Sequence, residues 1–152
     1  MNRAQIVWLH CTVALTALTG AVFAVMKYAM TSDDPFANAN HPLQPYLLDA
    51  HVVVGPLLVF AFGWIFGDHI WPKFTGRNRA QRKSGVSSMA MIVPMTLSGY
   101  LMQVATNDAL RKAMTITHWV ASGLFVVAYV AHLVAKPRLK SGQPRNQPLQ
   151  PS

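Results

Sequence analysis

Residues 117–138, THWVASGLFVVAYVAHLVAKPR, form an apolar stretch that carries one histidine near each end, His118 and His132. As a helix, this stretch is long enough to cross the roughly 30 Å hydrocarbon layer of a membrane. At 100° per residue, the two histidines lie about 40° apart around the helix and about 21 Å apart along it. The stretch therefore predicts a transmembrane helix that presents two imidazoles on one face, at two depths.

The rest of the chain has the composition of a membrane protein. Of its 152 residues, 52% are hydrophobic and only 12% are charged, which is about half the charged share of a soluble domain. One soluble domain of this length could not bury all of its long apolar stretches. They predict four transmembrane helices, at about 5–29, 46–71, 87–105 and 114–135. The first stretch is expected to be a retained span, because its apolar run is too long for a cleaved signal peptide.

The basic residues predict the orientation of these spans. Segment 31–45 contains no Lys or Arg, whereas segment 106–113 contains Arg111 and Lys112. The opposite side carries ten of the thirteen basic residues, namely Arg3, Lys73, Arg77, Arg79, Arg82, Lys83, Lys136, Arg138, Lys140 and Arg145. The positive-inside rule then places both termini in the cytoplasm. The net charge of +8 is thus explained by the anionic lipid surface and does not indicate nucleic acid.

Together these patterns predict an all-α, integral membrane four-helix bundle with up-and-down topology over residues 1–138. Residues 139–152 form a basic tail rich in Pro and Gln, which is expected to be disordered. The single cysteine, Cys11, excludes a disulfide, a Cys-rich zinc site and an iron–sulfur cluster within the chain. No C-x-x-C-H motif is present, which excludes covalent attachment of haem.

Five of the six histidines lie within the predicted spans, namely His10, His51, His69, His118 and His132. Ionisable groups inside a membrane are costly and are usually functional. His51 and His118 lie roughly 6–8 Å inside the outer boundary, and His10 and His132 lie roughly 6–10 Å inside the inner one. Pairs of imidazoles from facing helices suit haem iron, which takes two axial ligands and is enclosed by apolar side chains. Gly55 and Gly123 would either let a porphyrin pass or allow close helix packing.

With these histidines, the chain resembles the di-haem cytochrome b subunits of membrane oxidoreductases, in particular those of formate dehydrogenase and nickel–iron hydrogenase. The resemblance covers about residues 3–138 and rests on H-x13-H in the last span, with one early His in each of the first two spans. It implies that His51 and His118 hold an outer haem b, and that His10 and His132 hold an inner one. The resemblance also implies that the protein lies in the inner membrane of a bacterium and is part of the respiratory chain.

A rival scheme places both haems between the second and fourth spans, with His69 as the inner ligand in place of His10. The spacing opposes it, because eighteen residues on one helix and fourteen on the other differ by about 6 Å of rise. We therefore favour His10. Asp68 and His69 would then form a proton-handling pair beside a quinone, or simply a polar helix end near the interface.

The sequence thus predicts a subunit that carries electrons across the bilayer and has no independent catalytic activity. Its expected partners are membrane lipid, quinone or quinol, and a redox subunit of the iron–sulfur, flavin, molybdopterin or multihaem cytochrome c type. Two alternatives remain open. One is a membrane metal transporter or sensor that uses the same histidines, and the other is a haem-free anchor for an enzyme complex.

Overall fold

The computed structural model describes residues 2–34, 36–37, 39–72 and 82–134, and all regular secondary structure in these ranges is helical. The four long helices are α1 (Arg3–Tyr28), α2 (Gln44–Ile65), α4 (Arg82–Val104) and α5 (Asp108–Val134). A π-helical turn, η1 (Phe66–Ile70), continues α2. The prediction of an all-α chain with four long helices is confirmed. The tail 139–152 lies outside the described residues.

The starts of the first and last helices follow from local capping. At α1, the side chain of Asn2 accepts from the backbone N–H of Gln5, and the side chain of Gln5 accepts from the backbone N–H of Asn2, both at 2.8 Å. This reciprocal capping box satisfies two amides that the helix leaves free. At α5, Asn107 Oδ1 accepts from Leu110 N at 3.0 Å, and Asp108 adds an acidic side chain to the first turn, which the helix dipole favours.

The capping at Asn107 corrects one sequence-based expectation. The pattern of apolar residues starts the last span at about 114 and places segment 106–113 in a loop. The structure begins α5 at Asp108 instead, so that Arg111 and Lys112 lie in its first turns. Apolar periodicity missed this part of the helix because Asp108, Arg111 and Lys112 interrupt the apolar pattern, while the cap that starts the helix is a single Asn.

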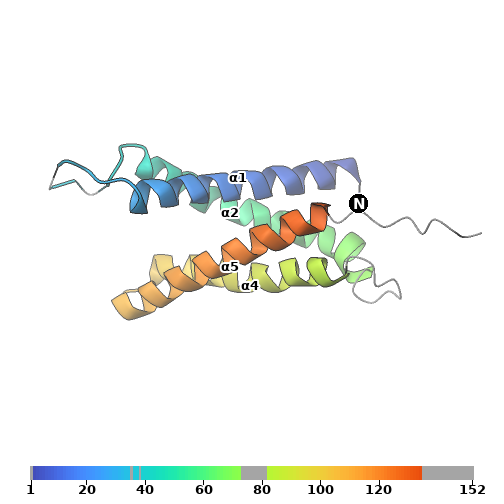
Figure 1. Cartoon of the computed structure of the whole chain (residues 1–152). Helices are drawn as coiled ribbons and strands as arrows, with labels where there is room; N and C mark the ends of the chain where they lie inside the picture. Colours follow the sequence, from blue (N-terminus) through green and yellow to red (C-terminus); the bar gives the residue numbers. More distant parts are fainter. Residues whose placement is uncertain (1, 35, 38, 73–81, 135–152) are drawn as a thin grey trace, which may run out of the picture.

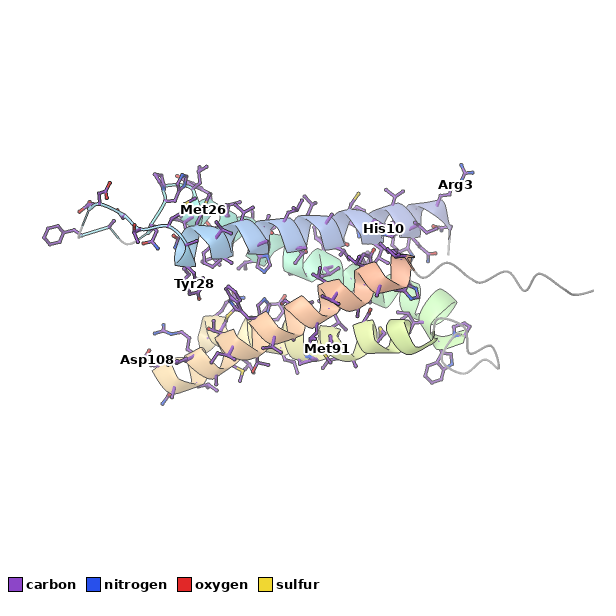
Figure 2. The ribbon with its side chains drawn as sticks, in the orientation of Figure 1. Arg3, His10, Met26, Tyr28, Met91 and Asp108 are labelled. Carbon is purple, nitrogen blue, oxygen red and sulfur yellow. The ribbon has the colours of Figure 1, made fainter. Side chains whose placement is uncertain are left out.

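The four helices are arranged as two hairpins. Helix α1 packs along α2, and α4 packs along α5, as Figure 1 shows. The start of α1 and the end of α5 lie at one end of the bundle, here called the Arg3 end. The end of α1 and the start of α5 lie at the other, here called the Asp108 end (Figures 1 and 2).

The buried core connects the two hairpins in the half of the bundle nearer the Arg3 end. Phe62 of α2 and Phe125 of α5 meet at its centre, with ring centroids 5.7 Å apart. All four helices contribute to the core cluster, which consists of Leu9, Val13, Leu58, Ala61, Phe62, Ile65, Ile92, Met95, Ala121 and Phe125. Toward the Asp108 end the same faces carry His51 and His118 instead.

Among the described residues, the helices α1, α2 and α5 are long and apolar enough to cross a membrane, and α4 contains a shorter apolar segment, Ser88–Val104. The outer faces of these helices are also apolar. Val53, Val104 and Val127, for example, are each about two-thirds exposed (68%, 72% and 67%). Such extensive apolar surface is unusual for a soluble monomer. The helices and their surfaces therefore indicate a membrane protein.

Candidate functional site

The structure brings His51 of α2 and His118 of α5 together across the two hairpins. Their ring centroids lie 6.1 Å apart, and their ring planes are nearly perpendicular, at 85°. Both side chains are half-buried. Sequence depth alone had predicted that these two histidines lie at the same level, and their pairing is now a feature of the structure.

Each of these imidazoles is oriented by a carbonyl oxygen of the neighbouring helix in its own hairpin. His51 Nδ1 lies 3.0 Å from the carbonyl oxygen of Thr16 and 3.2 Å from Thr19 Oγ1. His118 Nδ1 lies 2.8 Å from the carbonyl oxygen of Met95. A carbonyl only accepts, so Nδ1 carries the hydrogen in both rings. A neutral ring then has its lone pair on Nε2, which is the atom available to a metal.

A glycine stands beside each ring, four residues after the carbonyl that the ring contacts. A Cβ atom on Gly20 would lie 2.8 Å from His51 Cε1, and one on Gly99 would lie 3.1 Å from His118 Cε1. Gly20 follows Thr16, and Gly99 follows Met95, by one helical turn. Both hairpins thus use the same device, in which a glycine opens a helix surface so that a histidine from the partner helix can reach its backbone.

Sequence reasoning missed Gly20 and Gly99 and singled out Gly55 and Gly123. A Cβ atom on Gly55 or Gly123 would meet no described atom within 4 Å. Within the described part of the chain, Gly55 and Gly123 are therefore not required for close helix packing. Depth in the membrane is the signal that could have revealed these two glycines. Gly20 on α1 lies at the level of His51 on α2, and Gly99 on α4 lies at the level of His118 on α5.

At the Arg3 end, His10 of α1 contacts α5. Its Nδ1 shares a short hydrogen bond with the hydroxyl of Tyr129, and the two rings meet edge to face with centroids 6.0 Å apart. Tyr129 in turn stacks on Phe125 of the core, at 5.9 Å and 18°. His10 is therefore joined to the same helix that carries His132, through a residue that the sequence pattern did not single out.

The remaining candidates at this end are placed only in part. His132 lies one turn beyond Tyr129 on α5 and is half-buried. Asp68 and His69 lie in the π-helical turn η1, and their side chains are outside the described residues. The described contacts of His10 are with Tyr129, and the choice between His10 and His69 as partner of His132 stays a prediction.

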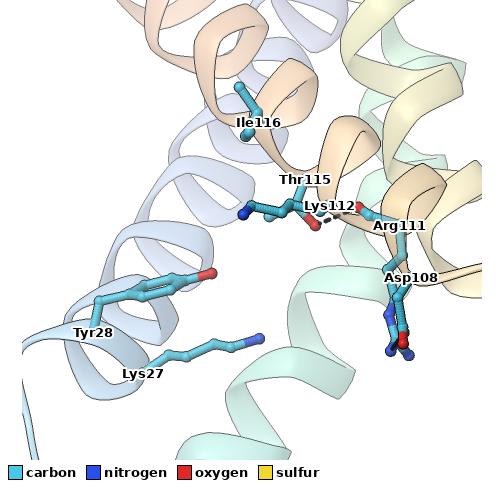
Figure 3. A pocket seen from close by; sticks show the side chains of 7 residues that line it. All are labelled: Lys27, Tyr28, Asp108, Arg111, Lys112, Thr115 and Ile116. Atoms are coloured by element: carbon cyan, nitrogen blue, oxygen red, sulfur yellow. Dashed lines mark hydrogen bonds and ion pairs between the residues drawn. The ribbon is translucent and has the colours of Figure 1, made fainter.

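A basic cavity lies between α1 and α5 at the Asp108 end (Figure 3). Its volume is about 440 Å³, and it is lined by Lys27, Tyr28, Asp108, Arg111, Lys112, Thr115 and Ile116. Arg111 forms an ion pair with Asp108. The ring of Tyr28 packs edge to face on Trp119, with centroids 5.1 Å apart, which places the cavity next to the turn of α5 that carries His118.

Comparison with known proteins adds no assignment to this geometry: no protein-family model matches the chain, and no curated protein or solved structure shows significant similarity to it. Within the described ranges, no three side chains of His, Cys, Asp or Glu are grouped so that they could hold a metal ion among themselves. The site that the described residues do form is a facing pair of imidazoles.

Proposed function

We propose that this protein is a membrane-embedded b-type cytochrome that carries electrons across the bilayer between a redox partner and quinone. The observation that carries the proposal is the facing pair of His51 and His118, which approach each other from separate hairpins. A haem of the bis-histidine type is held by two axial ligands from opposite sides of a flat macrocycle. Two hairpins that each fix one imidazole provide such an arrangement.

The spacing and orientation of this pair fit an iron ion held between the rings. Two imidazoles on opposite sides of one metal, each with its nitrogen about 2 Å away, have ring centres roughly 6 Å apart. The observed separation is 6.1 Å. Perpendicular ring planes are compatible with this geometry, because both planes can contain the same ligand–metal axis. The Nδ1 contacts leave Nε2 as the coordinating atom in each ring.

The residues around the histidine pair provide ligand positions and an apolar environment for a haem macrocycle. The carbonyl oxygens of Thr16 and Met95 hold the two imidazoles in place, and Gly20 and Gly99 leave room for the rings. The apolar faces of the four helices would exclude water from the macrocycle. The haem iron supplies reversible one-electron chemistry when bound. The chain itself supplies position, ligand orientation and insulation, which are the means by which a protein tunes such a cofactor.

The inner haem of this proposal would be held by His10 and His132. The hydrogen bond from His10 to Tyr129 supports it, since it attaches α1 to the helix of His132 at that level. When Nδ1 donates to this hydroxyl, Nε2 keeps its lone pair for a metal, as in the outer pair. His69 of η1, the turn that continues α2, is the alternative inner ligand, and in the favoured scheme it would serve quinone together with Asp68.

The proposed setting is the inner membrane of a bacterium, with both termini in the cytoplasm. The Arg3 end would face the cytoplasm, because most Lys and Arg residues of the chain follow or precede helices at that end. An electron carrier of this kind needs a partner that delivers or takes electrons. An iron–sulfur, flavin, molybdopterin or multihaem cytochrome c subunit would fill that role.

The test is a reduced-minus-oxidised absorption spectrum and a pyridine haemochrome assay on protein purified in detergent. We expect a b-type spectrum and two haems per chain, with one haem remaining in His51→Ala or His118→Ala. His41→Ala is the matched control, because His41 lies outside the helices and accepts a backbone hydrogen bond from Leu43 at 3.1 Å. A folded protein with no b-type signal would contradict the proposal and favour a metal transporter, a metal sensor or a haem-free anchor, which metal analysis would separate.

A further inference from the structure

The cavity at the Asp108 end has an excess of positive charge. It is lined by three cationic side chains, from two helices, and by one carboxylate. Arg111 and Asp108 pair with each other. Among the described residues, Lys27 and Lys112 form no ion pair, so two ammonium groups remain for a ligand. Figure 3 shows both extending into the space between α1 and α5.

The position of these charges works against local helix stability. Arg111 and Lys112 lie in the first turns of α5, where the helix dipole is positive and disfavours cations by several tenths of a kcal/mol, as an order of magnitude. They also lie at the end of the bundle that is otherwise poor in Lys and Arg. The pair with Asp108 offsets the charge of Arg111, so Lys112 is the cation in this part of the helix that has no ion pair among the described residues, which favours an anion in the cavity.

Lys27 is held in the direction of the cavity by aromatic rings. Its Nζ lies 5.6 Å from the ring centroid of Phe23 and 5.6 Å from that of Tyr28. Contacts of this kind orient an ammonium group without neutralising it. The side chain of Lys27 is therefore restrained beside the cavity by aromatic rings and not by an acidic group.

The cavity is also aligned with the histidine pair. Lys27 follows Gly20 by two helical turns on α1, and Arg111 precedes His118 by two turns on α5. Within each of these two pairs, the residues lie within about 20° of each other around the helix and about 10 Å apart along its axis. Gly20 touches His51. The cavity thus lies directly outward of both imidazoles, at the reach of the carboxylate arms of a macrocycle centred between them.

We propose that this cavity binds the two propionate carboxylates of the haem held by His51 and His118, with Lys27 and Lys112 as the recognition residues. The inference rests on the proposed function and adds an orientation, with the propionates toward the Asp108 end. The phosphate of a lipid headgroup would present similar anionic oxygens, and the experiment has to separate the two sources.

The experiment compares haem with its dimethyl ester, in which both carboxylates are neutral. Haem-free protein is loaded with either compound, and transfer to a haem scavenger gives the dissociation rate for the His51–His118 site, isolated in His10→Ala. We expect the ester to leave about tenfold faster than haem, because it loses charge-assisted hydrogen bonds. In Lys27→Gln with Lys112→Gln, haem should leave as fast as the ester, whereas Arg3→Gln, a charge removed at the opposite end, should keep the difference.

Three other outcomes would contradict the proposal that the cavity binds the propionates, and the measurements distinguish them. A b-type spectrum with equal dissociation of haem and ester in every variant leaves the cytochrome standing and overturns carboxylate recognition. Unchanged discrimination in the double variant, with weaker binding of phosphatidylglycerol to the detergent-solubilised protein, assigns the cavity to a lipid phosphate. A folded chain that retains neither compound overturns the proposed function and this inference together.

Discussion

The ring of His51 occupies the space that a Cβ atom on Gly20 would need. Such an atom would lie 2.8 Å from Cε1 and 3.1 Å from Nδ1 of the imidazole, both closer than van der Waals contact. The same ring donates from Nδ1 to the carbonyl oxygen of Thr16, one turn earlier on α1. The absence of a side chain at Gly20 therefore allows His51 to take this position. The position of His51 in turn sets its distance to His118.

Gly20→Ala is expected to displace His51 and to remove the outer haem, which lowers the haem content from two per chain toward one. The pyridine haemochrome assay measures this loss. Gly63→Ala is the matched control on α2, because a Cβ atom there meets no described atom within 4 Å. It should keep both haems and raise helix stability by up to about 1 kcal/mol. Full haem content in Gly20→Ala would show that the contact is not needed for ligation.

Gly99→Ala should have a smaller effect than Gly20→Ala, since its Cβ atom would lie 3.1 Å from His118 Cε1 and 3.2 Å from Nδ1. A shift of a few tenths of an ångström would relieve this contact. We expect the haem to be retained but bound more weakly, about tenfold in dissociation rate. Transfer to a haem scavenger gives that rate. A larger loss than in Gly20→Ala would reverse the proposed order of the two contacts.

The sequence predicted the all-α architecture because long apolar stretches leave the backbone few alternatives in lipid. It also predicted that His51 and His118 share a level, since depth follows from residue number once a helix is assumed. It did not predict Gly20, Gly99 or Tyr129. Which residue of a facing helix touches a given side chain depends on the rotation of both helices, and one sequence does not fix that rotation.

Phe125 offers a test of the core that is independent of haem. Its side chain is 2% exposed and packs against Phe62 at 5.7 Å and Tyr129 at 5.9 Å between ring centroids. Phe125→Ala should lower the free energy of unfolding by about 3–5 kcal/mol, measured by thermal or denaturant unfolding in detergent. Phe60→Ala, at a position 60% exposed, should change it far less. Equal effects would show that the two hairpins do not share this core.

Tyr129→Phe removes the hydroxyl that bonds to His10 and keeps the stacking on Phe125. If His10 is an axial ligand, the loss of this bond changes the donor strength of its ring. The inner haem should remain bound, and its midpoint potential should shift by up to about 60 mV, which corresponds to one hydrogen bond of about 1.4 kcal/mol in a one-electron couple. Potentiometric titration measures the shift. Tyr46→Phe is the control, because Tyr46 is exposed and lies at the other end of the bundle; it should leave both potentials unchanged. If Tyr129→Phe also leaves both potentials unchanged, His10 is not a ligand of the inner haem.

The inner ligand itself is decided by His10→Ala and His69→Ala. The contact between His10 and Tyr129 places α1 against the helix of His132, and the rise between His51 and His69 exceeds that between His118 and His132 by about 6 Å. Both arguments favour His10. We therefore expect one haem per chain in His10→Ala and two in His69→Ala, with the remaining haem of His10→Ala lost when His51 or His118 is also replaced. One haem in His69→Ala together with two in His10→Ala would instead place both haems between α2 and α5.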